Sequence, residues 1–365
     1  MIKVTLTNEI LRYITEIEQN RYKVSSVKLS QTVMNRLRKN SKKKSSYASN
    51  KIEGNPLSQR QVDEVIESDD RKHYLKPEQE IRNYFLALNF LEKKVSIKEK
   101  FSKKLILDVQ KLVENGASKE KIGLRGPMPP GVLFAVYDSK TGNPDYIPPE
   151  YCDIPGLLDE LVEYVNTTDD HPLIIAAVVH YQLVTIHPFE DGNGRTARLL
   201  SGYIMDLNGY GFNGIGSLEE YFAYDIDEYY ESIQMGLPVL YYSGRENPPH
   251  PEIWIHYFLR MVKLYSGKIC DLQLASEEED IAGSLSFLKG REKELLQFLI
   301  KNYRGEFTPI EVSRELSVTN KTIINRLAVL VKNGFVLPIL VNQRIRSYEL
   351  SEFTREHEKE IMKVL

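Results

Sequence analysis

The sequence lacks the features that mark secreted and membrane-spanning proteins. It has only two cysteines, Cys152 and Cys270, which lie far apart and suit a reducing compartment. No apolar run is long enough to span a bilayer, and the first residues lack the apolar stretch and cleavage site of a signal peptide. We therefore expect a cytoplasmic protein with no membrane contact.

An excess of charge of one sign is also missing. The chain has 48 Lys and Arg against 51 Asp and Glu, a net charge of −3, so binding to nucleic acid would need a local basic patch. Hydrophobic residues make up 42% and charged residues 27%, which is typical of a globular protein with a core. A length of 365 residues is enough for two or three domains.

The hydrophobic periodicity predicts a mainly α fold. Residues 1–95 have helical spacing throughout, apart from residues 36–50, which are basic and then Ser-rich and are expected to be a solvated loop or helix face. Acidic and small residues at 275–284 predict a linker. The remaining predicted helices before that linker cover residues 101–113, 154–165, 172–185, 196–208, 226–235 and 253–267.

A Gly- and Pro-rich segment, residues 123–149, interrupts the helical pattern. It holds a short β-like run at 132–137, a turn at 140–143 and a second run at 146–147. These features predict a β-hairpin.

The last part of the chain, residues 285–365, resembles a winged helix-turn-helix domain. Its patterns predict helices at 292–301, 308–316 and 319–332, then strands at 335–341 and 346–350. In the helix 319–332 we expect Ile323, Ile324 and Leu327 to face inward. Asn320, Lys321, Asn325 and Arg326, with Arg344 and Arg346 at the wing, would face solvent or DNA. Winged helices also bind proteins or dimerise, so both roles stay open.

The segment HPFEDGNGRTAR, residues 187–198, concentrates the chemistry of phosphoryl-type transfer. His187 has a side chain suited to accept a proton, and Asp191 is suited to hold Mg²⁺ against nucleotide phosphates. Gly192, Asn193 and Gly194, just before a helix, predict a nest of backbone N–H groups for a phosphate. Arg195 can add a charged contact to a phosphate oxygen.

This segment resembles the signature of the Fic family, and every fixed position of that signature is present. The matching residues are His187, Phe189, Asp191, Gly192, Asn193, Gly194, Arg195 and Arg198. The resemblance extends over roughly residues 40–240. It implies a helical fold in which His187 deprotonates a Ser, Thr or Tyr hydroxyl of a target protein, which then attacks the α-phosphate of ATP while Asp191 holds Mg²⁺. Phe189 would anchor the loop.

The resemblance implies further roles outside the signature. Residues 123–149 resemble the family's flap, a hairpin that pairs with an extended target segment. Tyr229 and Tyr230 stand where relatives contact adenine, although adjacent tyrosines are as often part of a core. His180 is expected to be structural. Gly194 favours AMP transfer, because relatives that act as kinases have lysine there.

Residues 49–55, SNKIEGN, fit the family's inhibitory motif. Ser49 and Glu53 are one helical turn apart, and Gly54 could end that turn, so the segment could also be an ordinary capped helix. In relatives the glutamate pairs with the second signature arginine, here Arg198, and makes ATP bind unproductively. The resemblance therefore implies that Glu53 silences the enzyme. In some relatives the same glutamate also supports removal of AMP.

We thus expect residues 1–95 to form a helical region with the inhibitory motif, 96–270 a Fic catalytic domain, and 285–365 a winged helix. The predicted function is self-inhibited transfer of AMP from ATP to a protein hydroxyl. The alternative is a transcriptional regulator with a nucleotide-sensing Fic-like domain and a DNA-binding winged helix. Self-modification and a homodimer are further interpretations that the sequence leaves open.

Overall fold

The computed structural model describes residues 2–26, 29, 31–68, 71, 73–118, 122–132, 134–137, 142–235, 250–341 and 344–365. The chain forms two compact units, one of Met1–Ser26 with Met34–Asp271 and one of Val27–Val33 with Leu272–Leu365. The fold is mainly helical, as the hydrophobic spacing predicts. No helix among the described residues is long and apolar enough to cross a membrane.

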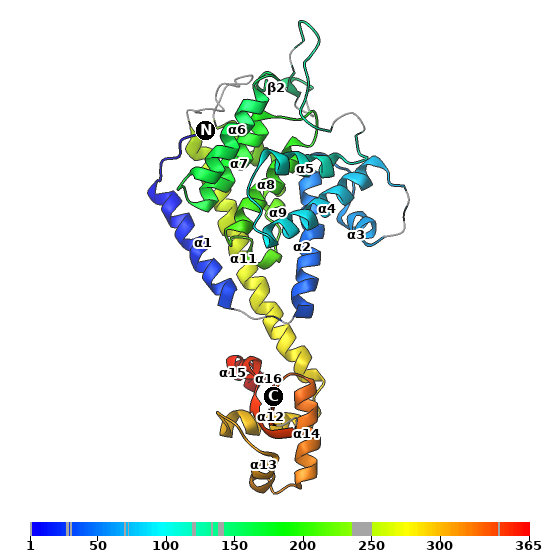
Figure 1. Cartoon of the computed structure of the whole chain (residues 1–365), viewed down its shortest axis with the longest axis vertical. Helices are drawn as coiled ribbons and strands as arrows, with labels where there is room; N and C mark the ends of the chain where they lie inside the picture. The colour runs from blue at the N-terminus through cyan, green and yellow to red at the C-terminus, as the bar shows by residue number, and fades with distance from the viewer. Residues whose placement is uncertain are drawn as a thin grey trace. The chain divides into compact units, whose positions relative to one another are not determined.

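The first unit contains most of the helices (Figure 1). Its elements, in chain order, are α1 (Asn8–Ser26), α2 (Gln31–Ile52), α3 (Gln59–Glu67), α4 (Lys76–Ser96), α5 (Lys103–Glu114), β1 (Val136–Tyr137), β2 (Pro144–Tyr146), α6 (Ile154–Thr167), α7 (Pro172–Ile186), α8 (Asn193–Leu207), the 3₁₀ turn η1 (Phe212–Gly214), α9 (Glu219–Phe222), α10 (Ile226–Gln234) and α11 (Pro251–Ser286), which runs into the second unit.

Helices α7 and α8 pack side by side at the centre of this unit, with α4, α5 and α6 against them (Figure 1). Almost every side chain of α7 is buried, so this helix is apolar all round, as a central helix of a bundle must be. The loop between α7 and α8 therefore projects from a rigid pair, and this loop carries the predicted catalytic residues.

Two predictions about polar segments were wrong in part. Residues 36–50 lie inside the continuous helix α2, where Arg36, Lys39, Asn40 and Lys44 are exposed but buried polar side chains such as Ser41 and Ser45 bond to other elements. The linker predicted at 275–284 lies inside α11. The segment has few bulky apolar residues, but Ile281 and Leu285, one turn apart, are buried in the core of the second unit and support the helix there.

The predicted hairpin is present, but its first strand is shorter than predicted and its second strand begins two residues earlier. β1 pairs with β2 in antiparallel register, with Val136 opposite Tyr146, and Ile147 is not in a strand. The predicted turn at 140–143 lies mostly outside the described residues.

The second unit contains α12 (Gly290–Asn302), α13 (Pro309–Glu315), α14 (Asn320–Lys332), the antiparallel strands β3 (Val336–Val341) and β4 (Arg344–Leu350), then α15 (Glu352–Glu356) and α16 (Glu358–Val364). The last two helices were not predicted. In α14, Ile323 and Leu327 are buried as expected, but Ile324 is 42% exposed, because its position faces away from that stripe. The winged-helix assignment stays a prediction.

Candidate active site

His187 caps the C-terminal end of the buried helix α7. Its φ of 49° lies in the left-handed region, which non-glycine residues rarely adopt. Nδ1 lies 3.2 Å from the Val184 carbonyl oxygen, and because a carbonyl only accepts, Nδ1 carries the hydrogen. Burial lowers the pKa of His187 to about 4. The imidazole is therefore neutral near pH 7, with the lone pair of Nε2 free to take a proton.

Arg125, near the start of the predicted flap, is hydrogen-bonded both to the end of the flap and to the loop that follows α7. Its Nε donates to the His187 carbonyl at 2.8 Å, its Nη2 donates to the Pro149 carbonyl, and its backbone N–H donates to the Pro188 carbonyl at 2.9 Å. Burial lowers the pKa of this guanidinium. The ring of Phe134 lies 5.9 Å from the imidazole of His187. The flap is thus attached directly to the loop that carries the predicted base.

The loop after His187 is shaped by two side chains. Asn193 accepts from the Phe189 N–H at 3.0 Å and donates to the Phe189 carbonyl at 2.8 Å, so its amide is used within the loop. Phe189 is fully buried, as expected for an anchor. Gly192 has a φ of 80° and precedes α8, whose first N–H groups face the loop. A cradle for an anion therefore stands at the N-terminal end of α8.

Arg195 is surrounded by carboxylates rather than left free to clamp a phosphate. Its Nη2 lies 2.9 Å from Glu114 and 3.3 Å from Asp191, and its Nη1 lies 3.9 Å from Glu80. The Glu114 side chain is fully buried, and this burial raises its pKa to about 7 even though Arg195 acts in the opposite direction. Glu114 belongs to no motif in the sequence and was not predicted; its only signal is its position one turn after Gln110 on the buried side of α5.

Arg198 is held by the predicted inhibitory motif. Its Nη2 donates to Glu53 Oε1 at 2.6 Å and to the Ser49 carbonyl at 3.0 Å, and its Nε donates to Ser49 Oγ at 2.8 Å. The Arg198 side chain is 1% exposed and that of Glu53 is 33% exposed. Burial opposes the charge of Arg198, but the carboxylate of Glu53 more than compensates and raises its pKa. The pair is therefore ionic.

Because Gly194 has no side chain, the carboxylate of Glu53 can lie close to the start of α8. A Cβ at Gly194 would lie 2.4 Å from Glu53 Oε1 and 3.2 Å from Arg198 Nη1. Only a residue without a side chain fits beside Glu53 in this arrangement. A carboxylate at this position would repel the phosphates of a nucleotide that approached the cradle.

The two candidate adenine contacts lie in different environments. Tyr229 is 1% exposed, and its hydroxyl accepts from Arg198 Nη1 at 3.3 Å and is hydrogen-bonded to His180 Nε2 at 2.8 Å. Tyr230 is 44% exposed. His180 is buried among the rings of Phe222, Tyr229, Trp254 and Phe258. Tyr229 thus belongs to the wall behind Arg198, and Tyr230 alone presents a ring to solvent.

The segment that contains the loop of His187 is similar to a known protein family. Residues 100–205, which include α5, α7, most of α8 and the loop of His187, match the Fic/DOC family. This segment is a Fic domain. The match runs from the helix that supplies Glu114 to within two residues of the end of α8, so the Fic domain contains the predicted base His187 and both signature arginines.

Three relatives are named protein adenylyltransferase Fic. Those of Drosophila grimshawi and Drosophila mojavensis are 28% and 29% identical over 205 residues, and that of Aedes aegypti is 29% identical over 201 residues. The matches cover 53–54% of this chain. The chain spans only 38–40% of the length of these relatives, so their activity is carried over to it below as a proposal.

Solved Fic structures share the fold. A Fic family protein from Desulfovibrio desulfuricans G20 superposes with a TM-score of 0.61 at 21% identity, covering 96% of this chain and 98% of its own. Fic-1 from C. elegans superposes with a TM-score of 0.56 at 24% identity, covering 74% of this chain and 73% of its own. At these identities the likeness is one of fold.

Proposed function

We propose that the protein is a self-inhibited protein adenylyltransferase, which transfers AMP from ATP to a Ser, Thr or Tyr hydroxyl of a target protein. The observation that carries the proposal is the neutral imidazole of His187 at the loop that forms the anion cradle of α8. Nucleotide sensing alone would need the cradle but not a base.

The residues divide the transfer reaction among them. Nε2 of His187 takes the proton of the target hydroxyl, and the hydroxyl oxygen forms a bond to the α-phosphorus of ATP. The bond from that phosphorus to the bridging oxygen breaks, and pyrophosphate leaves with the electron pair. The N–H groups at the start of α8 stabilise the charge that develops on the phosphate oxygens.

Asp191 suits Mg²⁺ only together with the phosphates of the nucleotide. The described residues contain no group of three or more His, Cys, Asp or Glu side chains that would hold a metal alone. Mg²⁺ in nucleotide sites uses one or two carboxylates plus phosphate oxygens, and the Asp191 side chain is 31% exposed in the loop. Mg²⁺ bound there would neutralise phosphate charge. Arg195 would then position Asp191 as well as contact phosphate.

Glu53 supplies the inhibition in this proposal. Its carboxylate occupies Arg198 and lies against Gly194, where the phosphates of ATP would have to pass. ATP then binds with its α-phosphate misplaced. The same carboxylate could orient a water for the removal of AMP, and a labelled substrate tests this second activity separately.

The target is proposed to bind along the flap hairpin. The edge of β1 opposite β2 has no strand partner among the described residues, so an extended target segment could pair with it. Self-modification is the special case in which the target is a segment of this chain or a second copy. A homodimer and a cytoplasmic location belong to the same proposal.

The decisive experiment follows transfer of label from α-labelled ATP in a cell lysate with Mg²⁺. It compares the wild type, Glu53→Gly and Glu53→Gly/His187→Ala. Label on protein only with Glu53→Gly would support AMP transfer, the base and the inhibition together. Equal label with wild type and Glu53→Gly would contradict the inhibition, and no label in any lane would contradict the transferase.

DNA binding by the second unit is the second candidate function. Lys321, Asn325, Arg344 and Arg346 are exposed or half-exposed on α14 and β4. A gel shift that weakens steeply with salt and prefers a defined sequence would favour a transcriptional regulator.

A further inference from the structure

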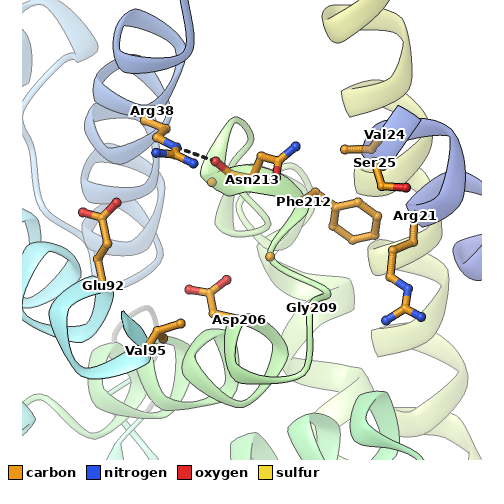
Figure 2. Close-up of a pocket in the computed structure, with 12 residues that line it drawn as sticks. Arg21, Val24, Ser25, Arg38, Glu92, Val95, Asp206, Gly209, Phe212 and Asn213 are labelled. Carbon is orange, nitrogen blue, oxygen red and sulfur yellow. Dashed lines mark hydrogen bonds between the residues drawn. The ribbon is translucent and has the colours of Figure 1, made fainter. Parts of the chain in front are cut away.

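A cavity away from the active site carries charges of opposite sign on its walls (Figure 2). It has a volume of about 310 Å³, which is enough for a small metabolite. Its walls come from the last turns of α1, α4 and α8, from α2, and from the loop of residues 209–214. The mechanism of AMP transfer uses none of these residues.

Asp206 supplies the negative side of the cavity. It is exposed and lines the cavity, and its carboxylate accepts no hydrogen bond from the described residues. Burial on its other sides, with Glu219 and Glu92 nearby, raises its pKa to about 7, and Lys42 lowers it. The cavity also faces the C-terminal ends of three helices, which carry partial negative charge. This end of the cavity therefore favours a cation.

Arg38 supplies the positive side. Its Nε donates to the Asn213 carbonyl at 2.7 Å, and its two terminal nitrogens have no hydrogen-bond partner among the described residues. Arg21, which also lines the cavity, is already paired with Glu18 at 3.0 Å. In Figure 2 the Arg38 guanidinium and the Asp206 carboxylate lie well apart, with Asn213 hydrogen-bonded to Arg38. One unsatisfied charge of each sign thus faces the same space.

We propose that this cavity binds a small zwitterion, with an ammonium group at Asp206 and a carboxylate at Arg38. A simple anion would meet Asp206, Glu92 and three helix ends, and a simple cation would leave Arg38 unpaired. A molecule that carries both charges pairs with Asp206 and with Arg38 at the same time. Val24, Val95 and Phe212 line the space between and suit an aliphatic spacer.

The test uses glycine amides as reporters at both sites. With isotope-labelled glycine, resonances of Gly209, Gly211 and Gly214 report on this cavity, and those of Gly192 and Gly194 report on the active site. The probes are glycine, γ-aminobutyrate and ε-aminocaproate, with hexylamine and caproate as half-probes that each carry one charge. We expect one of the zwitterions to shift the cavity glycines saturably, at least about tenfold more tightly than either half-probe.

Acidity and matched variants complete the test. The ammonium needs ionised Asp206, so affinity should fall about tenfold from about pH 8 to about pH 6. The charged and titratable groups around Asp206 are Glu219, Glu92, Lys42, Tyr265, Arg21 and Arg38. Asp206→Asn should lose at least about tenfold in affinity and all of the pH dependence, and Arg38→Gln should bind the zwitterion no better than hexylamine.

A control variant guards against a general effect of charge. Asp108→Asn, which removes an exposed carboxylate of α5, should bind the zwitterion like the wild type. Three results would overturn the proposal: no zwitterion shifts the cavity glycines, caproate alone binds as tightly as any zwitterion, or Asp206→Asn binds unchanged. Shifts confined to Gly192 and Gly194 would place the probe in the active site and would overturn it as well.

Discussion

Arg198 makes most of its hydrogen bonds with the last turn of α2 and with Glu53, which directly follows that helix. Ser49 provides two acceptors and Glu53 a third, while Tyr229 provides a fourth from α10. The arginine is therefore held by backbone and hydroxyl oxygens as well as by the carboxylate.

The side chains of Ser49 and Glu53 should contribute unequally. We predict that Ser49→Ala raises AMP transfer by about tenfold, because one hydrogen bond to a charged group, worth about 1.5 kcal/mol, is lost while Glu53 stays. Glu53→Gly should raise transfer much further. Rates of label transfer from ATP check this order, and a larger effect from Ser49→Ala than from Glu53→Gly would contradict it.

The pKa of His187 leads to a prediction about pH. Its folded-state pKa is lowered to about 4, and only the neutral form can accept a proton. The transfer rate of Glu53→Gly should therefore not fall until the pH drops toward about 4, rather than near the usual value of about 6.5. A pH–rate profile measures this. If the rate of label transfer instead fell with an inflection near pH 6.5, and a second protein substrate gave the same inflection, the pKa of His187 would not be lowered by burial.

Residue by residue, the sequence was informative where a motif fixes several positions together. It placed His187, Asp191 and Arg198 in one loop and helix, and the structure brings Glu53 onto Arg198 from the turn that follows α2. It was silent on Glu114 and Arg125, because each acts on a partner far away in the chain, and neither belongs to a local pattern. Such residues can be found only once the fold brings α5 and the flap against the loop.

At the scale of elements, α8 has one glycine at its N-terminal cap and another in its interior, and the two positions place different demands on the residue. Gly192 has a φ of 80°, and a Cβ there would lie 2.7 Å from Glu114 Oε1, whereas a Cβ at Gly202 of the same helix would meet nothing within 4 Å. Gly192 is thus required by both conformation and space, and Gly202 by neither.

These glycines form a matched pair for a stability measurement. We predict that Gly192→Ala lowers the free energy of unfolding by about 1–3 kcal/mol, because of strain and contact with a buried carboxylate. Gly202→Ala should raise it by about 0.5–1 kcal/mol through helix propensity. Urea unfolding followed by circular dichroism tests both. Equal effects of the two substitutions would contradict the role assigned to Gly192.

The elements themselves were largely predictable where apolar spacing is strong. Helices α5, α7 and α12 lie close to their predicted ranges. The predictions failed where a helix is held by polar contacts, as at residues 36–50, or has few bulky apolar residues, as at 275–284. Neither case leaves a strong apolar stripe in the sequence, which is the signal that periodicity detects.

Among the described residues, each unit has one large hydrophobic core, and the first unit also has a small separate cluster of Val62, Val65 and Ile81. The core of the first unit, as far as the chain is described, ends at Ile269, with Cys270 packed against it, and the core of the second begins at Ile281. Each unit therefore buries its own apolar surface.

This separation predicts that transfer does not need the second unit. A chain that ends at Asp271, in the Glu53→Gly background, should label its target within about twofold of the full-length rate, because the loop of His187 and its supports lie in the first unit. Label transfer measures this, with circular dichroism as the control for folding. A folded but inactive truncation would show that residues 272–365 contribute to the target or nucleotide site.

The way α2 is fastened has a thermal consequence. Among its described side chains, the buried ones are mainly polar: Ser41, Lys43, Ser45, Ser46, Ser49 and Asn50, against Ala48 and Ile52. Detaching this helix would expose little apolar surface, and the heat-capacity change of a transition scales with the apolar surface exposed. The free energy of detaching α2 should therefore vary almost linearly with temperature. Its ionic contacts, such as Lys42 with Glu92, make it respond to salt instead.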